Sequence, residues 1–421
     1  HMKQSNPDVK ELSPFLFKRF VKKHLEVAMD NNCLLHECST CMGAEGACYE
    51  LGTYLINNCS TDSLEDENFN AVVKALDDFY EPYSVIDPRD IPNYKPQERH
   101  RATKAIYVHN EGWLNPKLTL DSILASLEGF DSVKVIDDEV EVIVENGNRI
   151  SEVILKSGKI IEGDRFLLSV GAAASNLIEK SKLSIQIPRI FNGVGVSIQV
   201  RSKDYPHKKV IRTPNRGLAC GLYTVPFYTS PDVPYDELLI GSSNFIAPFD
   251  LDGPKVGAVQ NLLTGAMEQI NTYFYKAEIT AINYGNRPES ADTYPVFGKT
   301  SISNLVVCTG TKRDGFHLSP LLSELLNELL KGNEIDSKYD CFKPERELIK
   351  NYTREDAINM AVSHKVNASY QHGFVPSHDR LVELIEKSHR EDLEKLHDKV
   401  GAVDWGIPPS LIDMYRYGHI K

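Results

Sequence analysis

Short runs with strand character dominate the middle of the chain. Residues alternate between apolar and polar, or stay apolar throughout, over 105–109, 133–135, 139–144, 153–155, 165–170, 193–200, 210–213, 218–227 and 238–245. Gly147 and Gly158 separate neighbouring runs at positions suited to tight turns, which predicts an antiparallel meander. The run that ends at Val170 is followed by Gly171 and then alanines, where we expect a helix to begin. This order of strand, glycine and small helical residues is typical of a junction that faces a nucleotide.

Helical patterns precede and follow these strands. Apolar residues at helical spacing predict helices after a cap at Ser13-Pro14 and over 66–82, 116–127, 256–274, 353–362 and 377–399. A glycine-rich loop from Ser39 is expected to pass into helix before Asn58. Beyond Gly332 the chain becomes charged and helical, and we expect its last segment, 405–417, to pack on its own domain or on a partner.

The segment from Asn286 to Pro320 has the clearest pattern. It opens with a charged loop and a tight turn, Asn-Arg-Pro-Glu-Ser-Ala-Asp-Thr-Tyr-Pro-Val-Phe-Gly, and continues through a buried strand over 304–310. A glycine-rich break follows, and then a helix that is apolar from its first turn. α/β folds use this order of elements to present backbone N–H groups to a flat, anionic cofactor.

Composition narrows the class of protein. The 421 residues are 41% hydrophobic and 25% charged, which suits a globular protein of two domains with an extension. Acidic residues outnumber basic ones by 59 to 47, and the net charge of −12 argues against nucleic acid or an anionic membrane as the partner. No apolar run reaches the roughly 18 residues of a transmembrane segment, and no signal-peptide pattern opens the chain. Because the cysteines also lack an even framework, we expect a cytoplasmic protein.

Three separated motifs carry a resemblance to a known family. They are Trp113-Leu-Asn-Pro116, Asp164-Arg-Phe-Leu-Leu-Ser-Val-Gly171 and the loop from Gly310 to Gly315. In this order, across about residues 100–335, the chain resembles FAD-dependent amine oxidoreductases of the D-amino-acid oxidase, glycine oxidase and sarcosine oxidase superfamily. The resemblance implies oxidation of a C–N bond in an amino acid or related small amine, by hydride transfer to FAD. It also implies an α/β (α+β) fold, in which a Rossmann-type FAD-binding domain is interleaved with an antiparallel-sheet substrate domain.

The resemblance divides the chain into five segments. The FAD-binding domain is expected to comprise 3–104, its degenerate first part, then 105–185 and the closing part 287–335. Residues 186–286 would form the substrate-binding β domain, and 336–421 a helical C-terminal extension.

The same resemblance implies site residues. For FAD they are Glu37, Ser39, Gly43, Gly171, Gly310, Arg313, Asp314, Gly315 and Phe316. Arg287 would anchor a substrate carboxylate, since a guanidinium suits bidentate recognition, with Arg313 and Tyr223 beside it. A bland alternative is that Arg287 forms an ion pair with Asp292 in its own loop. His317 is a tempting base, although the chemistry does not require one.

The amino terminus departs from the family's dinucleotide fingerprint. Ser13-Pro-Phe-Leu-Phe-Lys18 stands where glycines are expected, so Phe15 and Lys18 bring Cβ atoms where bare backbone should approach pyrophosphate. Pro14 also removes one N–H donor. Gly43-Ala-Glu-Gly46 could serve as a displaced fingerprint. Otherwise a partner subunit supplies the missing turn, FAD binds through its remaining contacts, or the chain has lost it.

The cysteines near the amino terminus form a candidate metal site. Cys33, Cys38 and Cys41 have the spacing of three ligands of a plant-type [2Fe–2S] cluster, and Cys48 is a candidate fourth. Zinc held with His36 is an alternative, and so are plain thiols in a glycine-rich loop.

Two functions therefore stay open. One is a flavin-dependent oxidoreductase, most readily as part of a multi-subunit complex, because the phosphate cradle is incomplete. The other is a non-catalytic or partner-completed subunit that keeps the fold as a scaffold; the helical tail favours it and the matched loop at 310–316 opposes it.

Overall fold

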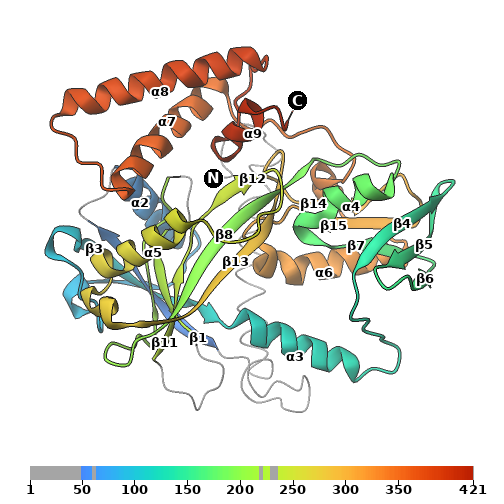
Figure 1. Cartoon of the computed structure of the whole chain (residues 1–421), viewed down its shortest axis with the longest axis horizontal. Coiled ribbons are helices and arrows are strands. Elements are labelled where there is room, and N and C mark those ends of the chain that lie inside the picture. Colours follow the sequence, from blue (N-terminus) through green and yellow to red (C-terminus); the bar gives the residue numbers. More distant parts are fainter. Residues whose placement is uncertain (1–48, 59–62, 218–220, 228–235, 421) are drawn as a thin grey trace.

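The computed structural model describes residues 49–58, 63–217, 221–227 and 236–420. Figure 1 shows two lobes side by side, one built on a large sheet and the other on a smaller sheet with a meander beside it. Helices near the C-terminus lie along the top of the large-sheet lobe. The mixed α/β architecture confirms the fold expected from the sequence.

The large sheet holds nine strands that come from distant parts of the chain. They are β1 (Tyr49–Asn58), β2 (Tyr83–Ile86), β3 (Ala102–Leu114), β8 (Ile190–Arg201), β9 (Val210–Arg212), β10 (Tyr223–Pro226), β11 (Glu237–Gly241), β12 (Phe245–Ala247) and β13 (Glu278–Ser290). Their order is β12-β8-β11-β10-β9-β1-β3-β2, and β13 pairs with β8 on its other side. Every pair is antiparallel except β1 with β9.

The helix expected before Asn58 is wrong, because β1 occupies residues 49–58. Leu55 and Ile56 are adjacent and both fully buried, so the segment has no helical face. β1 is hydrogen-bonded to β3 on one side and to β9 on the other. These partners lie more than 40 residues away in sequence, and local periodicity does not report them.

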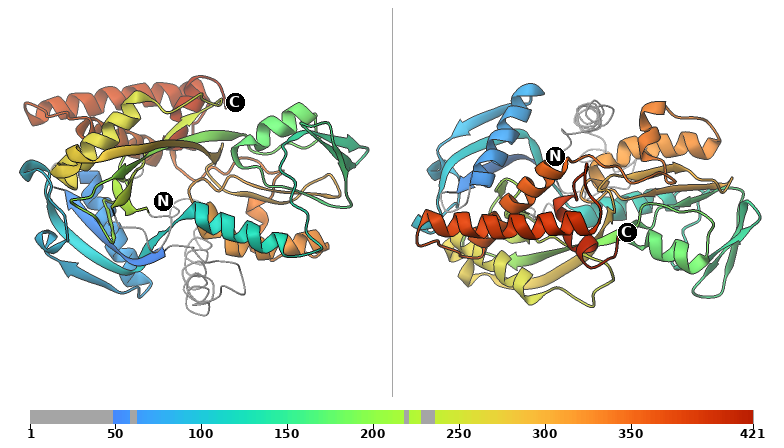
Figure 2. Two further views of the ribbon diagram at one scale, coloured as in Figure 1. Left: turned by 60° about the horizontal axis from the view of Figure 1, so that its bottom comes forward. Right: turned by 90° about the horizontal axis from the view of Figure 1, so that it is seen from above.

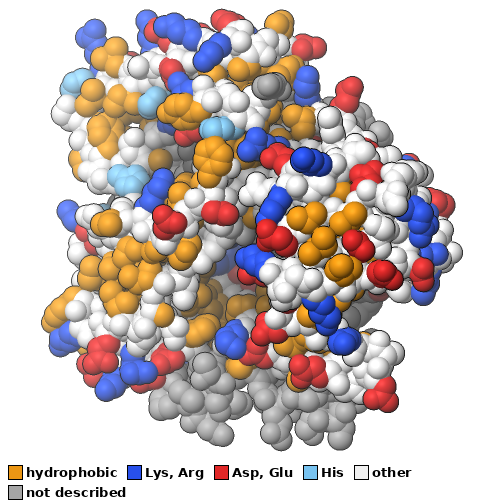
Figure 3. Space-filling model, turned by 45° about the vertical axis from the view of Figure 1, so that its right-hand side comes forward, with side chains coloured by type: hydrophobic (Ala, Val, Ile, Leu, Met, Phe, Trp, Pro, Cys, Tyr) orange, Lys and Arg blue, Asp and Glu red, His pale blue; other side chains and the backbone are white. Residues whose placement is uncertain are grey.

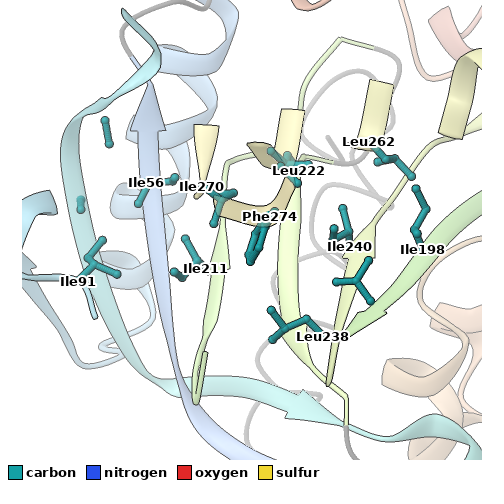
Figure 4. Close-up of a cluster of buried hydrophobic side chains, with 14 of the residues drawn as sticks. Ile56, Ile91, Ile198, Ile211, Leu222, Leu238, Ile240, Leu262, Ile270 and Phe274 are labelled. Atoms are coloured by element: carbon teal, nitrogen blue, oxygen red, sulfur yellow. The ribbon is translucent and has the colours of Figure 1, made fainter. Parts of the chain in front are cut away.

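One face of the large sheet forms the main core. Alternation along β8 sends Val196, Ile198 and Val200 toward helix α5 (Val256–Gln269) and its neighbour η5 (Thr272–Lys276). Figure 4 shows side chains of this cluster converging from several strands and from α5. Because this face is filled, Gly195 and Ser197 face the opposite side of the sheet.

The smaller lobe carries the nucleotide-type junctions. β7 (Phe166–Leu168) runs parallel to β15 (Leu305–Thr309), and β14 (Val296–Lys299) pairs antiparallel on the far side of β15. Helix α4 (Ala174–Ser181) and the short η4 (Gly171–Ala173) follow β7 as expected, and the meander comprises β4 (Val140–Asn146), β5 (Arg149–Leu155) and β6 (Ile160–Glu162). Helix α6 (Gly315–Lys331) follows β15 and buries one leucine stripe against it.

Residues 133–135 do not form the expected strand. They follow helix α3 (Pro116–Glu128), which Asn115 caps through hydrogen bonds to two backbone N–H groups. Apolar side chains on α3 and just beyond it are exposed in the described part of the chain: Leu120, Ile123, Leu124, Leu127, Phe130, Val133 and Val135. No described strand offers residues 133–135 a ladder of hydrogen bonds, and a strand needs that ladder.

The C-terminal extension packs on the body of the protein, as expected. It contains α7 (Arg354–Gln371), α8 (Asp379–Lys399), the short η7 (Pro409–Leu411) and α9 (Ile412–Arg416). Phe191 and Ala291 of the body enter a shared cluster with apolar side chains of the extension. Figure 2 shows α7 and α8 together on one side of the large sheet, near α2 (Ser63–Asp78).

Two expected segment boundaries fall inside strands. Residue 105 lies within β3 and residue 287 lies within β13, and both strands belong to the large sheet. Among the helices described, none is long and apolar enough to cross a membrane.

Candidate functional site

A pocket lies on the face of the large sheet opposite α5. Its volume is about 290 Å³, and it is lined by Gly195, Val196, Ser197, Tyr223, Ser242, Asn283, Tyr284, Gly285, Asn286 and Arg287. Arg287 and Tyr223, predicted separately as substrate residues, therefore meet in one pocket. Figure 3 shows a recess between the two halves of one side of the molecule, with hydrophobic side chains gathered to its left.

Glycines form the floor beneath both predicted side chains. The guanidinium of Arg287 lies over Gly195, where an added Cβ would overlap its Nη1 atom. The ring of Tyr223 lies over Gly241 in the same way, because a Cβ there would overlap the phenol end. Any larger residue at these two floor glycines would lift the side chain above it, so they set the depth of the pocket.

Arg287 does not pair with Asp292, and that alternative is wrong. Asp292 is fully buried and forms a bidentate ion pair with Arg346, with distances of 2.8 and 3.0 Å from Nη2 to the two carboxylate oxygens. Within the described chain, no carboxylate lies within ion-pair distance of Arg287, whose Nη1 is 3.4 Å from the Ser243 carbonyl oxygen. Its charge is thus available to an anionic ligand.

A second ion pair borders the pocket along the sheet. Arg212 lies directly opposite Tyr223 and holds Glu111 in a fork, with Nε–Oε1 2.5 Å and Nη2–Oε2 2.7 Å. Burial raises the pKa of Glu111, but the charge and hydrogen bonds of Arg212 outweigh burial and hold that pKa below its usual range. His317, in the first turn of α6, acts in the same direction, so α6 begins within electrostatic reach of this pair.

The loop between β15 and α6, residues 310–316, is the predicted flavin loop. Gly310 has φ +71°, and an added Cβ would lie 3.1 Å from the Tyr294 carbonyl oxygen, so glycine is required there. The Lys312 N–H donates to the Pro288 carbonyl at 2.9 Å. This bond ties the flavin loop to β13 one residue from Arg287.

The neighbouring junction after β7 meets the same loop. Gly171 has φ +59°, and its carbonyl accepts a hydrogen bond of 2.7 Å from the Thr309 hydroxyl at the end of β15. An added Cβ on Gly171 would meet no atom within 4 Å among the described residues, so this backbone faces open space. Two glycines thus expose backbone at adjacent strand ends, as a dinucleotide requires.

The described residues fit FAD along this edge. The Arg313 Nε atom is buried and has no hydrogen-bond partner in the described chain, so a donor is available to a ligand. Asp314 and Phe316 are exposed beside it, and Gly315 opens α6. Glu37, Ser39 and Gly43 lie outside the described residues.

The predicted metal ligands also lie outside the described residues. Cys33, Cys38, Cys41 and Cys48 all precede β1. The described cysteines, Cys308 and Cys341, are free thiols. Over the described ranges, no group of three His, Cys, Asp or Glu side chains is arranged to hold a metal ion.

Comparison with known proteins agrees with this geometry. Two strand ends with bare backbone, followed by an amphipathic helix and flanked by a sheet with a cationic pocket, define a flavoprotein of the oxidoreductase class. Residues 43–329 match the family model described as DAO, FAD dependent oxidoreductase, which is more than half of the chain. The chain belongs to this family of FAD-dependent oxidoreductases, which confirms the resemblance.

Individual relatives are distant. The bifunctional protein ThiO/ThiG of Trichormus variabilis is 24% identical over 240 residues, which cover 56% of this chain and 33% of that protein. The chain therefore spans about a third of the length of this curated relative. The structure of glycine oxidase from Geobacillus kaustophilus has a TM-score of 0.63 at 21% identity, covering 82% of this chain and 85% of that one. Iminodiacetate oxidase from a Chelativorans species gives 0.62 at 15% identity, covering 82% and 86%. At these identities the structures establish a shared fold.

Sequence reasoning missed the floor glycines and the pairing of Asp292 with Arg346. The run Gly193-Val-Gly-Val196, with glycine at alternate positions of an apolar strand, carries a usable signal for the floor beneath Arg287. Gly241 gives no comparable signal. Arg346 is 54 residues from Asp292, and nothing local marks it as the partner.

Proposed function

We propose that the chain oxidises the C–N bond of a small amino acid or related amine that carries a carboxylate, with FAD bound along the flavin loop. The observation that carries the proposal is the position of Arg287. It is a half-buried guanidinium without a carboxylate partner in the described chain, and its strand is hydrogen-bonded to the flavin loop through Pro288 and Lys312. The names of the glycine and iminodiacetate oxidases are consistent with such a substrate.

When bound, FAD supplies a hydride acceptor for the substrate's α-carbon. The chain's residues do the rest of the work by binding and orientation. Arg287 would hold the carboxylate through two parallel N–H···O bonds, which fixes the direction of the α-carbon relative to the flavin loop. Tyr223 would close the other end of the pocket. A volume of about 290 Å³ limits the substrate to a small amine.

The FAD-binding residues that we propose lie on two strand ends and one helix start. They are Gly171, Gly310, Arg313, Asp314, Gly315 and Phe316, with Glu37, Ser39 and Gly43 expected from the undescribed amino-terminal part. The [2Fe–2S] centre at Cys33, Cys38, Cys41 and Cys48, a partner subunit, a cytoplasmic location and the five-segment division stay predictions. A visible spectrum of anaerobically purified protein tests the first, since a cluster adds absorbance beyond the flavin bands.

The test of the function compares two substitutions in the pocket. Arg287→Ala should lower kcat/KM for a carboxylated amine by about 10- to 100-fold, the loss typical of a hydrogen-bonded charge pair. Gly195→Ala keeps the arginine but displaces its guanidinium, so it should raise KM for the same substrate. Neither change should affect turnover of an amine without a carboxylate.

The matched control is Gly285→Ala on β13. Gly285 also lines the pocket, but an added Cβ there meets nothing within 4 Å and its φ is not in the left-handed region. Unchanged turnover of carboxylated amines in Arg287→Ala would show that the anchor assignment is wrong. A colourless wild-type protein that binds no added FAD would favour the scaffold function.

A further inference from the structure

Glu289 is a buried carboxylate that the proposed reaction leaves unused. It lies two residues after Arg287 on β13, and because strand side chains alternate, both occupy the same face. Its side chain is 0% exposed. A carboxylate so far from water needs charged partners, and those partners come from other parts of the chain.

The first partner belongs to the flavin loop. Lys312 Nζ lies 2.7 Å from Glu289 Oε1, while the Lys312 N–H donates to the adjacent Pro288 carbonyl. Lys312 has φ +49°, a left-handed conformation that costs a side-chain-bearing residue free energy. Two contacts to β13 therefore hold the loop in a conformation that it would not adopt alone.

The second partner belongs to the C-terminal extension. The hydroxyl of Ser410, in η7, makes a hydrogen bond to Glu289, and the charge of Arg313 also acts on it. Burial raises the pKa of Glu289 despite these groups, which is the behaviour expected of a site closed to water. The substrate strand, flavin loop and extension thus meet at one carboxylate.

We propose that Glu289 is a positioning residue, which fixes the flavin loop against β13 through Lys312 and is itself fixed by Ser410. The bound flavin and the Arg287 guanidinium are then set at one mutual distance by a contact that touches neither ligand. The inference rests on the proposed function, and it gives the C-terminal extension a part in cofactor binding.

The experiment measures FAD affinity of the full-length protein by quenching of flavin fluorescence, with turnover recorded separately. Glu289→Gln keeps the shape of the side chain but leaves Lys312 without its counter-charge, so the FAD dissociation constant should rise by on the order of tenfold. Lys312→Met should weaken FAD by a similar factor. The double variant should be no weaker than either single one, because the two residues act as one unit.

The control is Glu237→Gln on β11. It makes the same chemical change in another ion pair of the same sheet, where Arg201 Nη2 is 2.6 Å from Glu237 Oε1, remote from the flavin loop. It should leave FAD affinity unchanged. Ser410→Ala is the mild variant that keeps the test open if Glu289→Gln does not fold, and it should weaken FAD several-fold with little change in Tm.

The outcomes separate the two ideas. Wild-type protein that binds no FAD would overturn the proposed function itself. Wild-type binding with unaltered FAD affinity in folded Glu289→Gln, Lys312→Met and Ser410→Ala would overturn only the positioning role. A lower Tm with unchanged FAD affinity in these variants would likewise assign the cluster to stability alone.

Discussion

Replacing Arg346 by alanine should be among the most destabilising single changes at any arginine described in the protein. Its guanidinium is 8% exposed and holds Asp292, which is 0% exposed, through contacts of 2.8, 3.0 and 3.1 Å. Breaking a buried pair from one side leaves an uncompensated charge and costs about 3–5 kcal/mol. Asp292 would keep its bonds from the backbone N–H groups of Tyr294 and Ile349, but these do not neutralise its charge.

The assay is thermal unfolding of three single variants under one condition. For a domain of 150–250 residues, a loss of about 3 kcal/mol lowers Tm by about 6 °C or more. Arg416→Ala is the surface control, because Arg416 pairs with a half-exposed Asp392 at 2.7 Å, and such pairs contribute about 0–1 kcal/mol. Arg287→Ala should resemble the control, since no described carboxylate pairs with it.

Two results would refute this reasoning. Arg346→Ala might prove no more damaging than Arg416→Ala, which would mean that the site relaxes or admits water. Alternatively, Arg287→Ala might cost as much stability as Arg346→Ala, and Arg287 would then be a structural residue rather than an anchor for substrate.

Three further predictions concern glycine, histidine and cysteine positions. Gly310→Ala should lower Tm and FAD affinity more than Gly147→Ala, because both have positive φ but only Gly310 has backbone 3.1 Å from an added Cβ; unfolding and flavin titrations compare them. Burial lowers the pKa of His207 to about 4, so between pH 6.5 and 4 the unfolded chain binds a proton that the native state refuses, and stability should fall by about 3 kcal/mol as pH drops through that window. Denaturant midpoints at several pH values should show this slope reduced in His207→Gln. Burial raises the pKa of the Cys308 thiol to about 11, so mapping of alkylated peptides should find it unmodified in native protein while the half-buried Cys341 reacts.

Much of the nucleotide-type edge was predictable from local sequence. Gly171 and Gly310 follow short apolar strands, and only glycine adopts their positive φ cheaply, so pattern and turn chemistry agree there. The leucine stripe of α6 repeats at helical spacing, and Gly332 ends that helix in the left-handed conformation. The prediction that Arg287 and Tyr223 belong to one site came from family resemblance, and their presence in one pocket agrees with it.

What the sequence by itself determined is therefore local: strand runs, glycine turns, amphipathic helices and a set of candidate charges. Tertiary structure alone decided which charges meet. Asp292 pairs with Arg346 across 54 residues, Glu289 meets Lys312 and Ser410, and β1 becomes a strand because β3 and β9 flank it. The physical reason is that propensity and periodicity act over a few residues, whereas burial of a charge or a strand edge is resolved by whichever distant group the fold brings within contact distance.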